Sequence, residues 1–252
     1  MASADEILSI VAAVLFAALL GQFSTRFLRS HWIPYLLIIF FCTIRVAGYG
    51  IRAYLDTNSL EYGSNTWISL YIAELVLLSI GAIFILLLLA RLYRSILPKL
   101  RAQTGEDRGK FERTLVDHTR LYLLPVIVCV IIGGTYAAPT YSESQQNTGL
   151  ILRKIGVVML GFVGFLYLVT ALMYRKRYPD NQQAFNIALI VTALFDVSLV
   201  YKIVYTFYSK AQTTTVAYFI LSPLLEIIAL CVLSVDLQGH FLGHPSLEDT
   251  KV

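Results

Sequence analysis

Residues 67–92 read WISLYIAELVLLSIGAIFILLLLARL, and Glu74 and Arg91 are the two charged side chains in this run. A helix needs about 20 mainly apolar residues to cross the ~30 Å hydrocarbon layer of a bilayer. Only helices and closed barrels satisfy their backbone polar groups in lipid. The run therefore predicts a transmembrane helix that begins at Trp67, where an indole ring favours the membrane interface.

Six further apolar stretches occupy most of the remaining chain. Of the 252 residues, 57% are apolar and 14% are charged, and the mean hydropathy is +0.69. Soluble domains instead have roughly 45–50% apolar and about 25% charged residues. We predict an all-α fold, a single seven-transmembrane helix bundle over residues 1–237 with a short tail at 238–252. The expected spans are residues 7–23, 32–55, 67–92, 121–138, 151–174, 184–208 and 216–237.

Lys and Arg residues are unevenly distributed between the two sides of this bundle. The first, third and fifth connections, their helix ends and the C-terminal tail hold 14 of the 20. Because loops rich in Lys and Arg stay in the cytosol, this predicts an outward N-terminus and a cytosolic C-terminus. The net charge of +4 lies mostly in those loops. The expected partners are the lipid bilayer and its anionic headgroups, not nucleic acid. The sequence does not indicate whether this membrane is the plasma membrane or an endomembrane.

Four charged side chains inside the predicted spans lie at similar depths. Counting along the ~1.5 Å helical rise places all four about 10–15 Å below the outer surface. They are Arg45, Glu74, Asp196 and Glu226. Charged groups in a membrane cost about 2.5–3.5 kcal/mol on insertion scales, and so they usually face the bundle interior and pair. The sequence therefore predicts a buried charged layer in the outer half of the bundle.

Two interpretations of this layer stay open. In the first, Arg45 neutralises one or two carboxylates and locks four spans together. In the second, one arginine does not neutralise three carboxylates, so the layer binds a ligand, an ion or a proton. The second interpretation favours a small cationic or lipid ligand.

Polar and aromatic residues near the outer ends of the second and sixth spans predict a vestibule above the layer. Arg45, Tyr49 and Arg52 share one helix face, because they are spaced i, i+4, i+7. The candidate vestibule residues are Tyr49, Arg52, Tyr201, Lys202 and Tyr205. Arg52 and Lys202 also lie near enough to their helix ends to extend their charges to the headgroups.

A metal site is the weaker alternative at the cytosolic end of the seventh span. Asp236, His240 and His244 are spaced four apart, so a continuous helix would place three zinc ligands on one face. This arrangement resembles in outline the seven-span zinc hydrolases of the progestin and adiponectin receptor and ceramidase type. Gly239 and Pro245 indicate that the helix ends there. We therefore predict no metal, no cofactor and no catalytic residues.

Short motifs occur along most of the chain: Trp32-Ile33, Arg45 with Gly48, Leu78-Ser79-Ile80-Gly81, Val200-Tyr201-Lys202-Ile203-Val204-Tyr205 and Leu225-Glu226. In these motifs the chain resembles a group of uncharacterised fungal seven-span integral membrane proteins. The resemblance implies the fold and residence in a membrane, and the group has no established activity.

A second, fainter similarity concerns the second span. Gly48-Tyr49 followed by Arg52 is similar to the Gly-Tyr-x-x-Arg motif of RTA-like lipid-translocating exporters. That similarity implies lipid transport.

Three function hypotheses result. The leading one is a membrane sensor or receptor-like protein, not an enzyme, that responds to a lipid or cation through the charged layer. The alternative is a lipid or small-solute exporter, which requires a continuous cavity between the helices. A zinc-dependent membrane hydrolase is the third.

Overall fold

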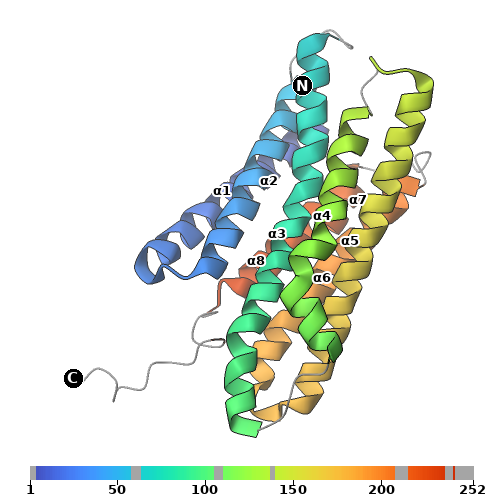
Figure 1. Ribbon diagram of the computed structural model, residues 1–252. Helices are drawn as coiled ribbons and strands as arrows, with labels where there is room; N and C mark the ends of the chain where they lie inside the picture. Colours follow the sequence, from blue (N-terminus) through green and yellow to red (C-terminus); the bar gives the residue numbers. More distant parts are fainter. Residues whose placement is uncertain are drawn as a thin grey trace.

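The computed structural model describes residues 4–57, 64–104, 110–136, 140–207, 215–235 and 241, which are helical apart from short connections. Seven helices within these ranges are long and apolar enough to cross a membrane. The prediction of an all-α, seven-span membrane protein is confirmed at this level. Figure 1 shows the helices running along a roughly common direction, with α1 and α2 side by side at one edge.

The first six spans are single helices, and the seventh is assembled from three pieces. The six are α1 (Ala4–Ser30), α2 (Ile33–Thr57), α3 (Asn65–Thr104), α4 (Lys110–Tyr136), α5 (Glu143–Arg177) and α6 (Gln182–Phe207). A 3₁₀ turn, η1 (Pro179–Asn181), joins α5 to α6. The seventh consists of α7 (Thr215–Phe219), the π-helical turn η2 (Ile220–Leu224) and α8 (Leu225–Leu233).

Helices that follow one another in the chain pack side by side, from α1 on α2 through to α8 on α6. The tightest connection joins α1 to α2 through His31 and Trp32. His31 adopts a left-handed φ of 50°, and its N–H donates to the Phe27 carbonyl at 2.7 Å. This hydrogen bond closes the end of α1 and turns the chain back on itself.

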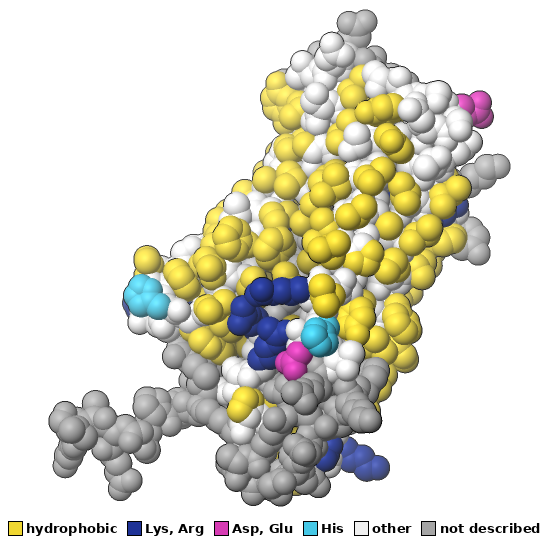
Figure 2. All heavy atoms as spheres, viewed as in Figure 1, with side chains coloured by type: hydrophobic (Ala, Val, Ile, Leu, Met, Phe, Trp, Pro, Cys, Tyr) yellow, Lys and Arg dark blue, Asp and Glu magenta, His cyan; other side chains and the backbone are white. Residues whose placement is uncertain are grey.

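The outer surface of the bundle is largely apolar. Leu, Ile, Val and Phe side chains are exposed along every span except α3, and Figure 2 shows a broad apolar band on one face. Soluble proteins rarely expose so large a continuous apolar surface, whereas lipid tails solvate one without cost. The structure thus places the expected lipid contact on the outside of the helices.

The α4–α5 contact depends on two glycines that lie opposite each other. A Cβ atom at Gly133 would lie 2.9 Å from the Gly149 carbonyl oxygen and 2.9 Å from the Arg153 nitrogen. A Cβ atom at Gly149 would lie 3.1 Å from the Gly133 oxygen. The two backbones therefore approach more closely than any side chain would permit.

The seventh span changes its helical geometry at Pro223. Proline lacks the backbone N–H and its ring clashes with the carbonyl one turn earlier, so it does not fit a regular α-helix interior. Here it lies inside the π turn η2, which places one additional residue in the span immediately before Glu226. The last residues of the predicted span, 236–237, lie outside the described ranges.

Candidate functional site

Three charged side chains from three different helices meet in the interior of the bundle. Arg45 of α2 donates from Nη2 to Oε1 of Glu226 in α8 at 2.7 Å. Lys202 of α6 donates from Nζ to the same oxygen at 2.6 Å. The side chains of Arg45 and Glu226 are each 1% exposed, and that of Lys202 is 21% exposed. We call these three residues the charge cluster, and its two cations outnumber its one carboxylate.

The guanidinium of Arg45 is held from several sides. Its Nη1 donates to the backbone oxygen of Leu78 in α3, and its Cζ lies 5.0 Å from the ring centroid of Phe41. Gly81 provides the space, since a Cβ there would lie 3.0 Å from Cζ of Arg45. Arg45 therefore links α2, α3 and α8, and its position is fixed.

Several polar atoms at and beside the cluster have no hydrogen-bond partner within the described ranges. They are Oε2 of Glu226, Nε of Arg45, the Ser222 hydroxyl and the Tyr201 hydroxyl. Leaving a buried polar group unsatisfied costs about 1–3 kcal/mol. A site with this much unused hydrogen-bonding capacity favours water or a polar ligand over a closed structural contact.

A small hollow lies on the N-terminal side of the cluster, between α1, α2 and the start of the seventh span. It has room for about one water molecule. The guanidinium of Arg52 lies over the Tyr218 ring in its wall, 4.6 Å from the centroid. The lining residues are Asp5, Leu8, Ser9, Tyr49, Arg52, Tyr218, Phe219 and Pro223.

The five candidate vestibule residues come together in part. Tyr49 and Arg52 line the hollow, whereas Tyr201 and Tyr205 stack on each other and lie against Tyr218. Lys202 does not extend toward headgroups, because Glu226 binds its ammonium group inside the bundle. Tyr218 connects the residues of the hollow with the Tyr201–Tyr205 pair. It was not predicted from the sequence, although an aromatic residue in the first turn of the seventh span could have indicated it.

Of the four residues predicted to share one charged layer, the structure joins Arg45 and Glu226. Glu74 lies within electrostatic range of Arg52. Asp196 points at α5, where a Cβ on Gly164 would collide with its carboxylate. Both Asp196 oxygens are buried without a hydrogen bond among the described residues.

The residues of the weaker metal hypothesis, Asp236, His240 and His244, lie outside the described ranges. Within those ranges no group of three or more His, Cys, Asp or Glu side chains is placed to hold a metal ion.

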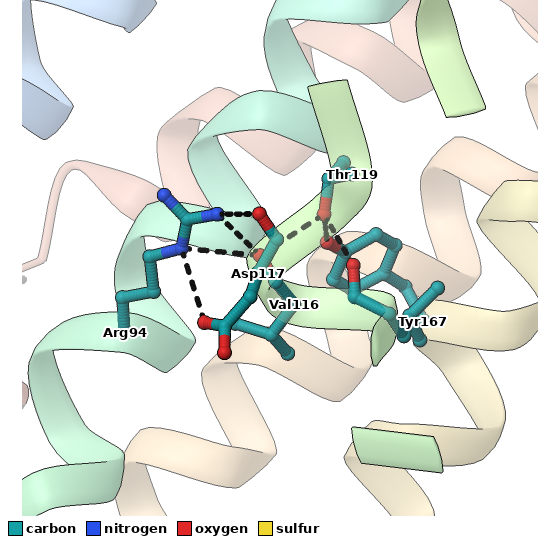
Figure 3. A network of polar contacts seen from close by, with 6 residues as sticks. Arg94, Val116, Asp117, Thr119 and Tyr167 are labelled. Atoms are coloured by element: carbon teal, nitrogen blue, oxygen red, sulfur yellow. Dashed lines mark hydrogen bonds and ion pairs between the residues drawn. The ribbon is translucent and has the colours of Figure 1, made fainter. Parts of the chain in front are cut away.

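A second polar network joins α3, α4 and α5 in the other half of the bundle (Figure 3). Arg94 donates from Nε and Nη2 to the Val116 oxygen at 3.1 and 2.7 Å, and from Nη2 to the Asp117 backbone oxygen at 2.6 Å. Thr119 and Tyr167 share a hydrogen bond between their hydroxyls. Arg94 follows Leu78 by 16 residues in α3, so this network lies about 24 Å from the charge cluster along the helix.

Asp196 and Glu226 are expected to respond oppositely to neutral replacement. Glu226→Gln removes the carboxylate that accepts hydrogen bonds from Arg45 and Lys202, and should destabilise the fold. Asp196→Asn should leave the stability unchanged or raise it, because a buried carboxylate without a partner gains nothing from its charge. Chemical unfolding of both variants in the same detergent checks this. Equal losses in the two variants would show that Asp196 has a stabilising partner and would return it to the site.

A family model described as a domain of unknown function, DUF7702, matches residues 6–238. The match covers all three residues of the charge cluster and both polar networks. No curated protein and no solved structure matches the chain. Because the family model matches nearly the whole length, this chain belongs to the DUF7702 family of unknown function.

Proposed function

We propose that this protein is a receptor-like membrane sensor and that the charge cluster is its responsive site. The seven apolar helices and the family match support a polytopic membrane protein. The distribution of Lys and Arg supports an outward N-terminus and a cytosolic C-terminus. In that orientation the hollow beside the cluster opens toward the outer side.

The observation that carries this proposal is that one carboxylate oxygen accepts hydrogen bonds from two cations of unequal accessibility. Arg45 is enclosed, whereas Lys202 is 21% exposed. A ligand that reaches Lys202 would compete with Glu226 for it, while Arg45 keeps the carboxylate neutralised. The two arrangements differ in a defined contact between α6 and α8, and a ligand shifts an equilibrium only through such a difference.

The charge balance of the cluster favours an anionic ligand. The cationic ligand expected from the sequence required an excess of carboxylates at the cluster, but Glu74 lies near Arg52 and Asp196 faces Gly164 of α5. Two cations and one carboxylate leave one positive charge, which an anion neutralises. The hollow beside the cluster has room for about one water-sized group, not for a whole lipid. This size supports a sensor over an exporter, which needs a continuous passage.

The broken seventh span provides a route from the site to the C-terminal side. Glu226 lies directly after the π turn, and π turns inside helices occur frequently at functional sites. Release of Lys202 loosens α8 from α6 near this break. The part of the seventh span that follows Glu226 then changes its packing, so that release of Lys202 at the site alters the structure at the C-terminal side.

Exchange of the anion is expected to change the stability of the protein, whereas exchange of the cation is not. The purified protein in phosphatidylcholine nanodiscs is unfolded by heat in sodium chloride, sodium gluconate and choline chloride at equal ionic strength. We expect a lower midpoint in gluconate, by roughly 2–4 °C for each kcal/mol of chloride binding, and equal midpoints in sodium and choline chloride. Chloride binds the folded site, and gluconate is too large for the hollow.

Two variants of Lys202 test whether this response belongs to the cluster. Lys202→Met should remove the difference between chloride and gluconate, and Lys202→Arg should keep it. The difference between the chloride and gluconate midpoints is measured within each variant, so a change in the basal stability of that variant cancels. A midpoint that follows the cation, or that responds to neither exchange, would overturn the assignment of an anion site.

A further inference from the structure

Three arginines from α3 and α4 crowd together at the end of the bundle opposite the hollow. Arg91 lies within electrostatic range of both Arg120 and Arg94. Arg94 is engaged by carbonyl groups of α4, and its Nε lies 3.8 Å from Oδ1 of Asp117. Arg91 and Arg120 have no hydrogen bond or ion pair within the part of the chain that the structure describes. Among the described residues, Arg94 is thus the member of this group that has a carboxylate partner.

This basic patch lies at the edge of the lipid-facing surface. Figure 2 shows Lys and Arg side chains gathered along the margin of the apolar band. Directly after Arg120, α4 continues with Leu121 and Leu124, whose side chains are 65% and 59% exposed. The patch therefore lies where headgroups meet lipid tails. This position favours a ligand with both a charged group and apolar chains over a soluble anion, which has no use for the apolar surface.

We infer that Arg91 and Arg120, with Arg94 beside them, bind the phosphate group of an anionic membrane lipid. Guanidinium groups bind phosphate through paired N–H donors, and a phosphate between two unpaired arginines replaces their repulsion by attraction. The acyl chains of the same lipid lie over Leu121 and Leu124. The contacts of Arg94 with α4 keep the two helices at a fixed spacing, so the pair of free arginines forms a prearranged site.

The number of free cations favours a phosphomonoester headgroup. A phosphomonoester carries about −1.5 to −2 charges at neutral pH, whereas the phosphodiester of an ordinary phospholipid carries about one. Arg91 and Arg120 together supply two positive charges that no described side chain neutralises. Phosphatidic acid, which has such a headgroup, is therefore expected to bind more tightly than phosphatidylglycerol, which has a phosphodiester.

Lipid titration of the full chain tests this site. The protein is placed in phosphatidylcholine nanodiscs that contain increasing fractions of phosphatidic acid or phosphatidylglycerol, and bound lipid is measured by native mass spectrometry. The double variant Arg91→Gln/Arg120→Gln should weaken phosphatidic acid binding about 25-fold, or about fivefold for each arginine. The control is Arg175→Gln/Lys176→Gln, which removes two exposed charges from the same end of the bundle, at the end of α5. Its affinity should not change.

Each result decides the proposal. Equal losses in the two double variants would reduce the effect to general surface charge and overturn the site. Inorganic phosphate added to nanodiscs that contain phosphatidic acid should not displace the bound lipid; if it competes as well as phosphatidic acid does, the ligand is a soluble phosphate and the lipid assignment fails. If the double variant does not fold, Arg120→Gln alone, which changes an exposed side chain, should still lower the affinity about fivefold.

Discussion

Arg45→Met is expected to lower the free energy of unfolding by about 3–5 kcal/mol, the usual cost of breaking a buried ion pair by removal of one partner. Arg45 and Glu226 are both 1% exposed, so solvent does not screen their interaction. The same substitution removes the hydrogen bond to Leu78 and the contact with Phe41. Lys202 still neutralises Glu226, which places the expected loss toward the lower end of this range. Equilibrium unfolding in mixed micelles measures it.

Two further variants separate the ion pair from simple packing. Arg45→Lys keeps the charge but should recover little stability, because a lysine does not bridge the Leu78 carbonyl and Glu226 as a guanidinium does. The double variant Arg45→Met/Glu226→Gln should lose less than the sum of its single variants, because each single variant already breaks the contact between the two side chains. Additive losses would show that the two residues contribute independently and that the pair does not hold α2 to α8.

Gly133→Val is expected to cost about 3 kcal/mol or more, at or above the upper end for an overpacked core. The new Cβ atom would lie 2.9 Å from backbone atoms of α5, and backbone does not move aside as a flexible side chain does. The helices α4 and α5 must then separate along their whole contact. Unfolding under the same conditions as for Arg45→Met measures the loss.

Gly50→Val is the matched control for this substitution. Gly50 also lies inside a predicted span, but a Cβ atom there meets nothing within 4 Å. Its replacement should change the stability by less than about 0.5 kcal/mol, as for a surface position. If Gly133→Val and Gly50→Val behave alike, the close α4–α5 approach does not exist in the folded protein.

The seven spans could be predicted from the sequence because apolar runs report directly on the length of a membrane crossing. Polar continuations of the helices could not be found in this way. Helix α3 runs on to Thr104 and α5 starts at Glu143, beyond the predicted spans, because a helix outside the hydrocarbon layer has no reason to be apolar. The π turn at Pro223 gave no signal beyond the proline itself.

The candidate site was predicted from the depth of each side chain in the membrane. Depth gives the position along the helix axis, but not the direction in which the side chain points around that axis. Counting residues placed Arg45, Glu226 and Asp196 at similar heights, but a side chain also has a direction around its helix axis. Asp196 and Lys202 are six residues apart in α6, so they point about 120° apart around the axis. Lys202 therefore faces Glu226 while Asp196 faces Gly164, which no count of depth distinguishes.

The π turn in the seventh span determines the direction in which the Glu226 side chain points. A π turn contains one residue more than the α-helical turn it replaces, so every side chain after it is rotated by about 100° relative to an uninterrupted α-helix. Glu226 points at Arg45 and Lys202 with this offset in place. Conversion of η2 to regular α-helix would turn the carboxylate away from both cations. The π turn thus sets the direction of the carboxylate around the helix axis, and with it the pairing of Glu226 with Arg45 and Lys202.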